Sequence, residues 1–283
     1  MSNGALIFAF NNEKIDYIRQ AVFSAKRIKQ FLGISTSIVT HDIQHVLSHY
    51  EYTVFDKIIE YKSKKPVNTR RFSDGSLYSH VANFNNYNRS YAYELSPYEN
   101  TLLIDSDYII SNNLLSNCFT SDSELAMYSE SLDLCSHRTN EEFKRISDTS
   151  VQFYWATVVY FTKTEKSKIF FDLVQHIEEY WEHYTQLYQI HTSIFRNDFA
   201  FSIAAHILNN FSNGKSVDHL PGKMYYTLDR DIVYSIENDK INFLIEKEHY
   251  LGEYTPICTK NLNVHIMNKF SLNRLILDGN KNE

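Results

Sequence analysis

Hydrophobic runs and a helical periodicity alternate along the first part of the chain. Residues 5–10 form a continuous apolar run of strand length that ends at two asparagines. Over residues 14–32 apolar side chains recur every three or four positions, which predicts an amphipathic helix, and Gly33 stands where such a helix would be capped. Apolar runs at 37–40 and 54–59 predict two further strands. The order strand, helix, strand predicts a right-handed crossover and an α/β fold with a mostly parallel open sheet flanked by helices.

The middle of the chain carries the same two signals. Residues 101–104 are apolar or β-branched and run directly into two carboxylates, which predicts a buried strand with acids at its end. The aromatic run at 151–161 predicts a longer strand, and the periodicity of residues 165–184 predicts an amphipathic helix. Another helical pattern follows residues 196–198, and Asp198 would be its N-cap or a first-turn acid. Further short strands are predicted at 124–128, 242–246 and 263–270.

Length and composition indicate how many domains the chain forms, which surface charge it has and in which compartment it is found. The chain has 283 residues, 43% of them hydrophobic, and a net charge of -6. These values suit one large domain or two intimate ones and exclude a surface that is basic throughout. The scattered Cys118, Cys135 and Cys258 indicate reduced thiols in a cytosol-like compartment and no zinc site. Because no signal-peptide core and no apolar stretch of ~20 residues is present, we expect a soluble cytoplasmic protein with no membrane partner.

Asp105 and Asp107 are the strongest candidates for chemistry. The backbone turns at the end of a strand, so the two carboxylates can converge as a hard-oxygen site for a divalent cation. The alternative is an ordinary turn or a helix start. Asn11-Asn12 and His41-Asp42 also follow predicted strands. Because the carboxyl ends of parallel strands meet at one edge of a sheet, the three segments point to one ligand site.

No glycine-rich nucleotide loop accompanies this edge. The sequence has neither G-x-G-x-x-G nor G-x-x-x-x-G-K-[ST], so a bound diphosphate would need a metal held by the aspartates. Residues 83–93 are rich in amides and aromatics, which suit sugar hydroxyls and sugar faces. Arg89 in this segment is either a diphosphate or sugar contact or a structural surface arginine. A basic cluster comprises Lys62, Lys64, Lys65, Arg70 and Arg71. It is either a solvated loop or a flexible segment that approaches a phosphate-rich acceptor or closes over the donor.

Four features follow one another in order along the chain. They are the opening strand and helix, Leu-Leu-Ile-Asp-Ser-Asp at 102–107, Arg-Asn-Asp at 196–198 and Val-His-Ile-Met-Asn-Lys at 264–269. Together they resemble the GT-A glycosyltransferases, nearest to the glycogenin and galactosyltransferase-like retaining group and its compact phage-encoded members. The resemblance implies a GT-A fold with one catalytic domain over residues 1–270. This domain would divide into a nucleotide-binding half (1–110) and an acceptor-side half (111–270), followed by a C-terminal tail (271–283).

The resemblance also implies roles for the matching residues. Asp105, Asp107 and His265 would hold a metal ion, and their mixed oxygen and imidazole ligands favour Mn²⁺ over Mg²⁺. From the residues alone, a lone histidine in an apolar run is more often part of the core. Lys269 would contact the diphosphate, and Asp105 would also approach the ribose. Contacts with the base and ribose would come from Phe8, Ala9, Phe10, Asn11 and Asp42.

Two further side chains would take part in the transfer reaction. Asp198 would be a base for the acceptor in an inverting enzyme, or would stabilise the sugar's positive charge or orient the acceptor in a retaining one. Arg89 would stabilise the leaving group. Asn268 and Ala156-Thr157 stand where family members often have glycine or serine, which leaves the geometry of the acceptor side open.

The implied activity is transfer of a sugar from a nucleotide-diphosphate donor, expected to be UDP-linked, to a hydroxyl group, with retention of configuration. The acceptor would be a glycan or a hydroxymethylated base in phage DNA. One alternative is a nucleotidyltransferase that makes nucleotide sugars, but it would need a glycine-rich basic loop where Asn11-Asn12-Glu13-Lys14 stands. The other is a non-catalytic sugar-binding protein, which would keep the aromatics without needing the aspartates and His265 together.

Overall fold

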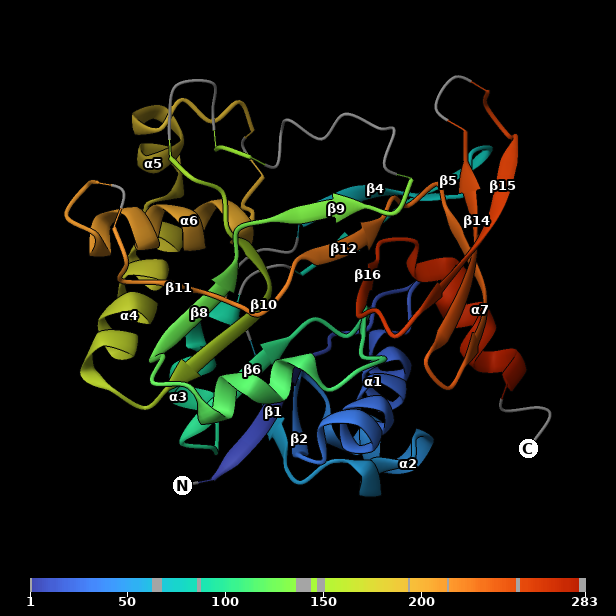
Figure 1. Cartoon of the computed structure of the whole chain (residues 1–283), viewed down its shortest axis with the longest axis horizontal. Helices are drawn as coiled ribbons and strands as arrows, with labels where there is room; N and C mark the ends of the chain where they lie inside the picture. Colours follow the sequence, from blue (N-terminus) through green and yellow to red (C-terminus); the bar gives the residue numbers. More distant parts are fainter. Residues whose placement is uncertain are drawn as a thin grey trace.

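The computed structural model describes residues 2–62, 68–85, 88–135, 144–146, 151–192, 194–212, 214–247 and 250–279. At its centre lies a seven-stranded sheet in the order β11-β8-β10-β6-β1-β2-β3 (Figure 1). Strand β10 is antiparallel to both of its neighbours, and every other pair is parallel. The predicted α/β fold with a mostly parallel sheet is confirmed. The strands are β1 (Asn3–Phe8), β2 (Ser35–Thr40), β3 (Ile58–Glu60), β6 (Asn100–Ile104), β8 (Leu125–Tyr128), β10 (Trp155–Thr162) and β11 (Asp218–His219).

The helices flank this sheet, and the first one forms as predicted. Helix α1 (Tyr17–Leu32) begins where the Asp16 carboxylate accepts a hydrogen bond from Arg19 N, and it ends at Gly33 in the left-handed conformation (φ 69°). It packs against β2 and so completes the predicted strand, helix, strand unit. The remaining helices are α2 (Ile43–His49), α3 (Ala92–Leu95), α4 (Glu165–Glu179), α5 (Trp181–Leu187), α6 (Asn197–Leu208) and α7 (Lys269–Gly279).

A second sheet joins distant parts of the chain beside the end of β6. Its order is β7-β16-β12-β9, with β7 at Tyr108–Ile109, β16 at Val264–Ile266, β12 at Met224–Thr227 and β9 at Ser131–Asp133. Strand β16 pairs with β7 so that His265 lies opposite Tyr108, and Ile266 N donates to Asp107 O at 2.9 Å. This pairing places His265 beside the segment that follows β6.

Two smaller β units complete the fold. Strands β13 (Ile232–Glu237), β14 (Lys240–Glu246) and β15 (Tyr254–Lys260) form an antiparallel sheet. Strands β4 (Asn68–Asp74) and β5 (Tyr78–Phe84) form a hairpin.

The hydrophobic core fixes the strands that carry the site. Leu6 and Ile7 of β1, Leu103 of β6 and Val158 of β10 are fully buried in the larger core cluster. Truncation of such a side chain to alanine typically costs about 2–5 kcal/mol of folding free energy. A second cluster gathers β13, β14, β16 and α7, with Phe243 among its buried members.

Two helix predictions differ from the structure. The pattern at 165–184 divides into α4 and α5 because Tyr180 leaves helical geometry (φ -105°, ψ 36°). This break places the Trp181 ring 5.1 Å from that of Phe195. The segment expected as a C-terminal tail instead forms most of α7, because Leu272 and Ile276 are spaced to bury themselves in the second cluster.

Two predictions for the segment after β2 are also corrected. Residues 54–59 do not form one strand, since Tyr52–Val54 is a 3-10 turn and only Ile58–Glu60 runs beside β2. In the basic cluster, Arg70 and Arg71 belong to strand β4 and not to a loop, while Lys64 and Lys65 lie outside the described residues. None of the described helices is both long enough and apolar enough to cross a membrane.

Candidate functional site

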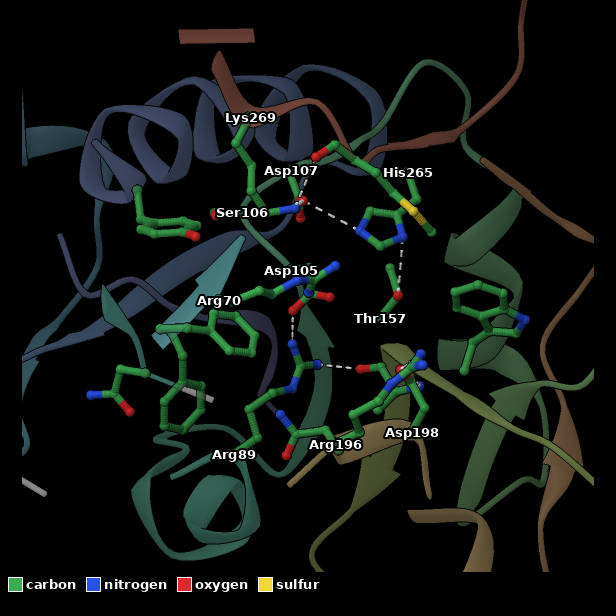
Figure 2. Close-up of a pocket in the computed structure, with 18 of the residues that line it drawn as sticks. Arg70, Arg89, Asp105, Ser106, Asp107, Thr157, Arg196, Asp198, His265 and Lys269 are labelled. Atoms are coloured by element: carbon green, nitrogen blue, oxygen red, sulfur yellow. Dashed lines mark hydrogen bonds and ion pairs between the residues drawn. The ribbon is translucent and has the colours of Figure 1, made fainter. Parts of the chain in front are cut away.

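A cavity of about 520 Å³ opens beyond the carboxyl ends of β1 and β6, the edge that the sequence predicts (Figure 2). Its size falls within the ordinary range for small-molecule sites. The lining side chains come from α1, the β4–β5 hairpin, β10, α6 and the segments around β16. They include Phe8, Phe10, Tyr17, Arg70, Phe84, Asn85, Arg89, Asp105, Ser106, Asp107, Trp155, Ala156, Thr157, Arg196, Asn197, Asp198, Asp229, His265, Met267 and Lys269.

The turn after β6 directs two carboxylates into this cavity. Asp105 N donates to Thr157 O at 2.9 Å, which holds the end of β6 against β10. Tyr108 N then donates to Asp105 O at 3.1 Å and closes the turn. Asp107 is only 4% exposed. Asp107 is therefore buried and Asp105 is half-buried at the cavity, in a hydrogen-bonded turn and not in a solvent-exposed loop.

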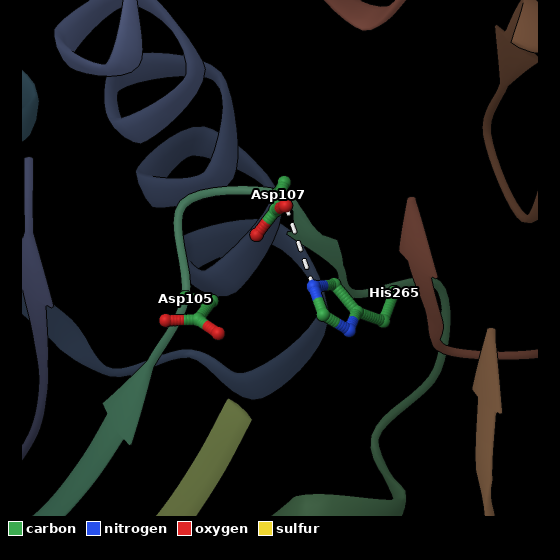
Figure 3. Close-up of side chains that lie close together, drawn as sticks. All are labelled: Asp105, Asp107 and His265. Carbon is green, nitrogen blue, oxygen red and sulfur yellow. Dashed lines mark ion pairs between the residues drawn. The ribbon is translucent and has the colours of Figure 1, made fainter. Parts of the chain in front are cut away.

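His265 completes a cluster with these aspartates (Figure 3). One ligand atom from each of Asp105, Asp107 and His265 lies within 4.8 Å of the others. His265 Nε2 lies 3.3 Å from Asp107 Oδ2, and Thr157 Oγ1 lies 3.3 Å from His265 Nδ1 on the opposite side of the ring. His265 is thus buried, as a core histidine would be, but its ring faces the aspartates.

The donor atoms of this cluster fit a divalent cation. His265 Nε2 is buried without a hydrogen bond among the described groups, which leaves its lone pair available if Nδ1 donates to Thr157. Metal-ligating histidines commonly donate their other ring N–H to an outer partner, and the Thr157 hydroxyl would take that place here. Two carboxylates with one imidazole suit Mn²⁺ or Mg²⁺, and the nitrogen ligand favours Mn²⁺.

Lys269 stands beside the same cluster. Its Nζ lies 2.6 Å from Asp107 Oδ2 and 3.3 Å from Met267 O. Burial opposes ionisation of Asp107, but the adjacent charge of Lys269 helps to hold the pKa of that carboxyl well below its usual range. Asp107 is therefore a carboxylate throughout the neutral pH range.

Arg89 is buried, which rules out the surface arginine considered from the sequence. Its guanidinium pairs with the Asp105 carboxylate and donates to the carbonyl oxygen of Ala156. Burial lowers the pKa of Arg89 to about 10, against the opposing charges of Asp198 and Asp107, so the side chain remains a cation at neutral pH.

Asp198 lies in the first turn of α6, as predicted, but it does not cap that helix. Its Oδ1 accepts a hydrogen bond from Ala156 N at 2.9 Å, and its Oδ2 lies 3.2 Å from Arg196 Nη2. The strand pairing of β10 is irregular between Trp155 and Val159, so the backbone N–H and C=O groups of Ala156 are available to side chains.

The residues predicted to contact the base and ribose divide into two groups. Phe8 and Phe10 line the cavity. Ala9 is buried in the core, and the Asn11 amide is occupied by Asp16, Tyr50 and Ile18 N. Asp42 is exposed and caps α2 through His45 N. Three of the five predicted contacts thus lie at the correct sheet edge but outside the cavity lining.

The basic cluster also divides. Arg70 lines the cavity, whereas Arg71 is exposed outside it and Lys62 is exposed with its Nζ 3.1 Å from Glu60. Sequence reasoning did not single out Tyr17 or Asp229. Neither carries a local signal, because Tyr17 is one apolar position of α1 and Asp229 follows a short strand whose place depends on the whole fold.

No protein-family model and no curated protein matches the chain. Among solved structures, its fold is similar to that of the glycosyltransferase GlyE of Streptococcus pneumoniae TIGR4, with 14% sequence identity and a TM-score of 0.44. That alignment covers 78% of this chain and 45% of GlyE, so the chain spans less than half of GlyE's length.

The fold is also similar to that of LgtC. For an active-site mutant of LgtC the identity is 15% and the TM-score 0.48, with 76% of this chain and 72% of that chain covered. For the galactosyltransferase LgtC in complex with donor and acceptor sugar analogs the identity and coverage are the same and the TM-score is 0.46. At these identities and scores the likeness is one of fold alone, so the side chains of the site itself have to support any function.

Proposed function

We propose that the protein is a metal-dependent glycosyltransferase that moves a sugar from a nucleotide-diphosphate donor to a hydroxyl acceptor. The observation that carries the proposal is the convergence of Asp105, Asp107 and His265 beside Lys269 in one cavity. Oxygen and imidazole ligands for a metal ion, with the Lys269 ammonium group beside them, supply the positive charge that a diphosphate needs where no glycine-rich loop exists.

Asp105, Asp107 and His265 would hold the metal, which when bound would offset the negative charge of the diphosphate. Lys269 is placed to do the same through its ammonium group, since its Nζ already lies at the Asp107 carboxylate. Cleavage of the bond between the sugar C1 and the diphosphate oxygen leaves the electron pair on the leaving group. Fixed cations near that oxygen stabilise the transition state more than the bound donor.

Asp198 would act on the transferred sugar. Two hydrogen-bonded partners, Ala156 N and Arg196, fix its carboxylate at the cavity wall (Figure 2). A fixed negative charge there would stabilise the positive charge that develops at C1, or would orient the attacking hydroxyl. Retention of configuration is proposed from the resemblance to the retaining group.

The donor is proposed to be UDP-linked, with Phe8 and Phe10 offering aromatic surface to its nucleoside. The acceptor is proposed to be a glycan or small glycoside hydroxyl, with a hydroxymethylated DNA base as the other candidate. Thr192 lines the cavity on the approach to α6, and its hydroxyl is a suitable partner for a sugar hydroxyl.

A thermal-shift panel of nucleotide sugars, with and without Mn²⁺, tests metal and donor together. We expect the unfolding temperature to rise with one nucleotide class and only when Mn²⁺ is present, because ligands that bind the native state stabilise it. Transfer of a labelled sugar from that donor should then be detected. Equal shifts with free sugars in the absence of metal, with no turnover, would instead indicate a sugar-binding protein. Consumption of a nucleoside triphosphate and a sugar phosphate would indicate a nucleotidyltransferase.

A further inference from the structure

We propose that Arg70 and the hydroxyl of Tyr17 form a second phosphate-binding element in the cavity, which recognises the donor's diphosphate apart from the metal ligands. The inference rests on the proposed function and adds a determinant that would select a diphosphate over a monophosphate. Arg70 comes from the β4–β5 hairpin and Tyr17 from the first turn of α1. Both side chains line the cavity.

Arg70 is held over the cavity by aromatic rings. Its guanidinium carbon lies 5.4 Å from the ring centre of Phe72 and 5.3 Å from that of Phe84. Phe84 also lines the cavity, whereas Phe72 is buried beneath the hairpin. Contacts with ring faces orient an arginine and leave its N–H donors unused. Figure 2 shows the side chain among those that surround Asp105.

The hairpin that carries Arg70 is anchored at its turn. The Asp74 carboxylate accepts hydrogen bonds from both terminal nitrogens of Arg274 at 2.6 and 2.8 Å. Ser73 N donates to Asp229 Oδ2 at 3.1 Å, and Ser76 Oγ lies 2.7 Å from the Tyr254 hydroxyl. Arg70 is therefore presented by a fixed element, which reduces the entropy lost when it binds an anion.

Among the four cations that line the cavity, Arg70 differs in its partners. Within the described part of the chain it has no carboxylate partner, whereas each of the others is within ion-pair distance of an aspartate. An incoming anion would compete with an aspartate for those three cations, but Arg70 is available without such competition. The three pairs are Arg89 with Asp105, Lys269 with Asp107 and Arg196 with Asp198.

Tyr17 offers a second unused donor in the same wall. Its hydroxyl oxygen is buried and makes no hydrogen bond to any described residue. A buried hydroxyl without a partner is costly, and a phosphate oxygen would satisfy it. Burial raises the pKa of Tyr17, as does the nearby charge of Asp107, while Arg70 acts in the opposite direction. The phenol is thus a neutral donor.

Arg70 and Tyr17 lie on the side of the cavity that holds the acidic cluster. Arg70 is among the side chains around Asp105 (Figure 2). Helix α1, which carries Tyr17, contacts the same region one turn later, where Gln20 Nε2 donates to Lys269 O at 3.1 Å and Gln20 Oε1 accepts from Ser106 Oγ at 3.4 Å. The diphosphate of the donor belongs on this side of the cavity. Asp198 and Arg196, which the proposed mechanism places at the reacting sugar, come from α6 and approach from another direction (Figure 2). Arg70 and Tyr17 therefore bind the leaving group.

Calorimetric titration of UDP and of UMP, each with Mn²⁺, tests the inference. Arg70→Gln should weaken UDP binding by about tenfold, which is typical for the loss of one charge-assisted hydrogen bond. It should weaken UMP binding by less than about threefold, because UMP lacks the second phosphate. Tyr17→Phe should weaken UDP binding by about threefold, because it removes a neutral donor only. Arg71→Gln is the matched control, since Arg71 is the exposed neighbour in the same strand, outside the cavity lining, and its loss changes the net charge equally. It should leave both affinities within about twofold.

The outcomes separate this inference from the proposed function. If the unsubstituted protein and Arg71→Gln bind UDP with Mn²⁺ while Arg70→Gln binds it equally well, the inference is wrong and the proposed function stands. Equal losses for UDP and UMP would place Arg70 at the nucleoside or the α-phosphate, which the two ligands share, and would overturn the selection of a diphosphate over a monophosphate. Failure of the unsubstituted protein to bind UDP with Mn²⁺ would overturn the donor proposal and the inference with it. Arg70 is exposed, so Arg70→Gln should unfold at the same temperature as Arg71→Gln.

Discussion

The Asp198 carboxylate is bound to the backbone of Ala156, whose N–H donates to Oδ1 at 2.9 Å. The carbonyl oxygen of the same residue accepts a hydrogen bond from Arg89. One irregular residue of β10 therefore sets the positions of the two side chains that the resemblance assigns to catalysis. Because α6, η2 (Arg89–Tyr91) and β10 are far apart in the sequence, the relationship depends on tertiary packing.

Asp198→Asn tests the charge of this side chain separately from its position. The amide oxygen of asparagine can still accept a hydrogen bond from Ala156 N, so the contact between α6 and β10 should be kept. The negative charge is removed. We expect the rate of sugar transfer to fall by about a hundredfold or more, as for loss of one preorganised electrostatic contact. Donor affinity, measured by calorimetry, should change little. A transfer rate close to that of the unsubstituted protein would remove Asp198 from the mechanism.

Asp107→Asn tests the metal site. Loss of a charged ligand should weaken Mn²⁺ binding by about two orders of magnitude, as measured by electron paramagnetic resonance of free Mn²⁺. Lys269 would lose its partner, so a stability decrease of about 1–3 kcal/mol should accompany the change and can be measured by urea unfolding. Asp42→Asn is the matched control, because Asp42 is an exposed helix cap at the same sheet edge and asparagine caps equally well. Equal Mn²⁺ affinity in the two variants would refute the metal assignment.

Thr157→Val tests the hydroxyl behind His265. The replacement keeps the volume of the side chain but removes the oxygen 3.3 Å from Nδ1, so the imidazole loses the group that fixes its tautomer. We expect Mn²⁺ affinity to fall by about tenfold, the lower end for outer-shell partners of metal ligands. Thr157→Ser, which retains the hydroxyl, should restore most of the affinity. If serine and valine behaved alike, the methyl group and not the hydroxyl would matter.

The sequence predicted the acidic cluster of the candidate site better than it predicted which of the proposed nucleotide contacts line the cavity. Asp105 and Asp107 were found because an apolar strand leads into two acids, a pattern that burial of β6 enforces locally. Asn11 and Asp42 lie at the predicted edge, but short-range hydrogen bonds within the loop and helix cap use their side chains. Such local competition is typical of Asn and Asp, and sheet topology alone does not reveal it.

The β4–β5 hairpin shows a different limit of prediction from sequence. Its strands carry polar and basic residues, and within β4 only Phe72 is buried. A strand that covers a cavity has little apolar alternation, so its pattern resembles that of a loop. The direction of Arg70 into the cavity follows from anchors such as Asp74 with Arg274, which are distant in sequence. Sequence patterns could therefore detect the charge of this segment but not its role.

The response of transfer to salt should distinguish the two acceptor classes. Among the described residues of the basic cluster, Lys62 is within ion-pair distance of Glu60 and Arg70 faces the cavity, which leaves Arg71 as an exposed cation for an external phosphate backbone. A DNA acceptor held by several phosphate contacts would lose affinity steeply as salt rises. We therefore expect transfer to a small glycoside to vary less than about threefold between low and physiological salt. Labelled transfer to hydroxymethylated duplex DNA, assayed in parallel, should be weak; efficient transfer that falls steeply with salt would contradict the glycan proposal and favour DNA.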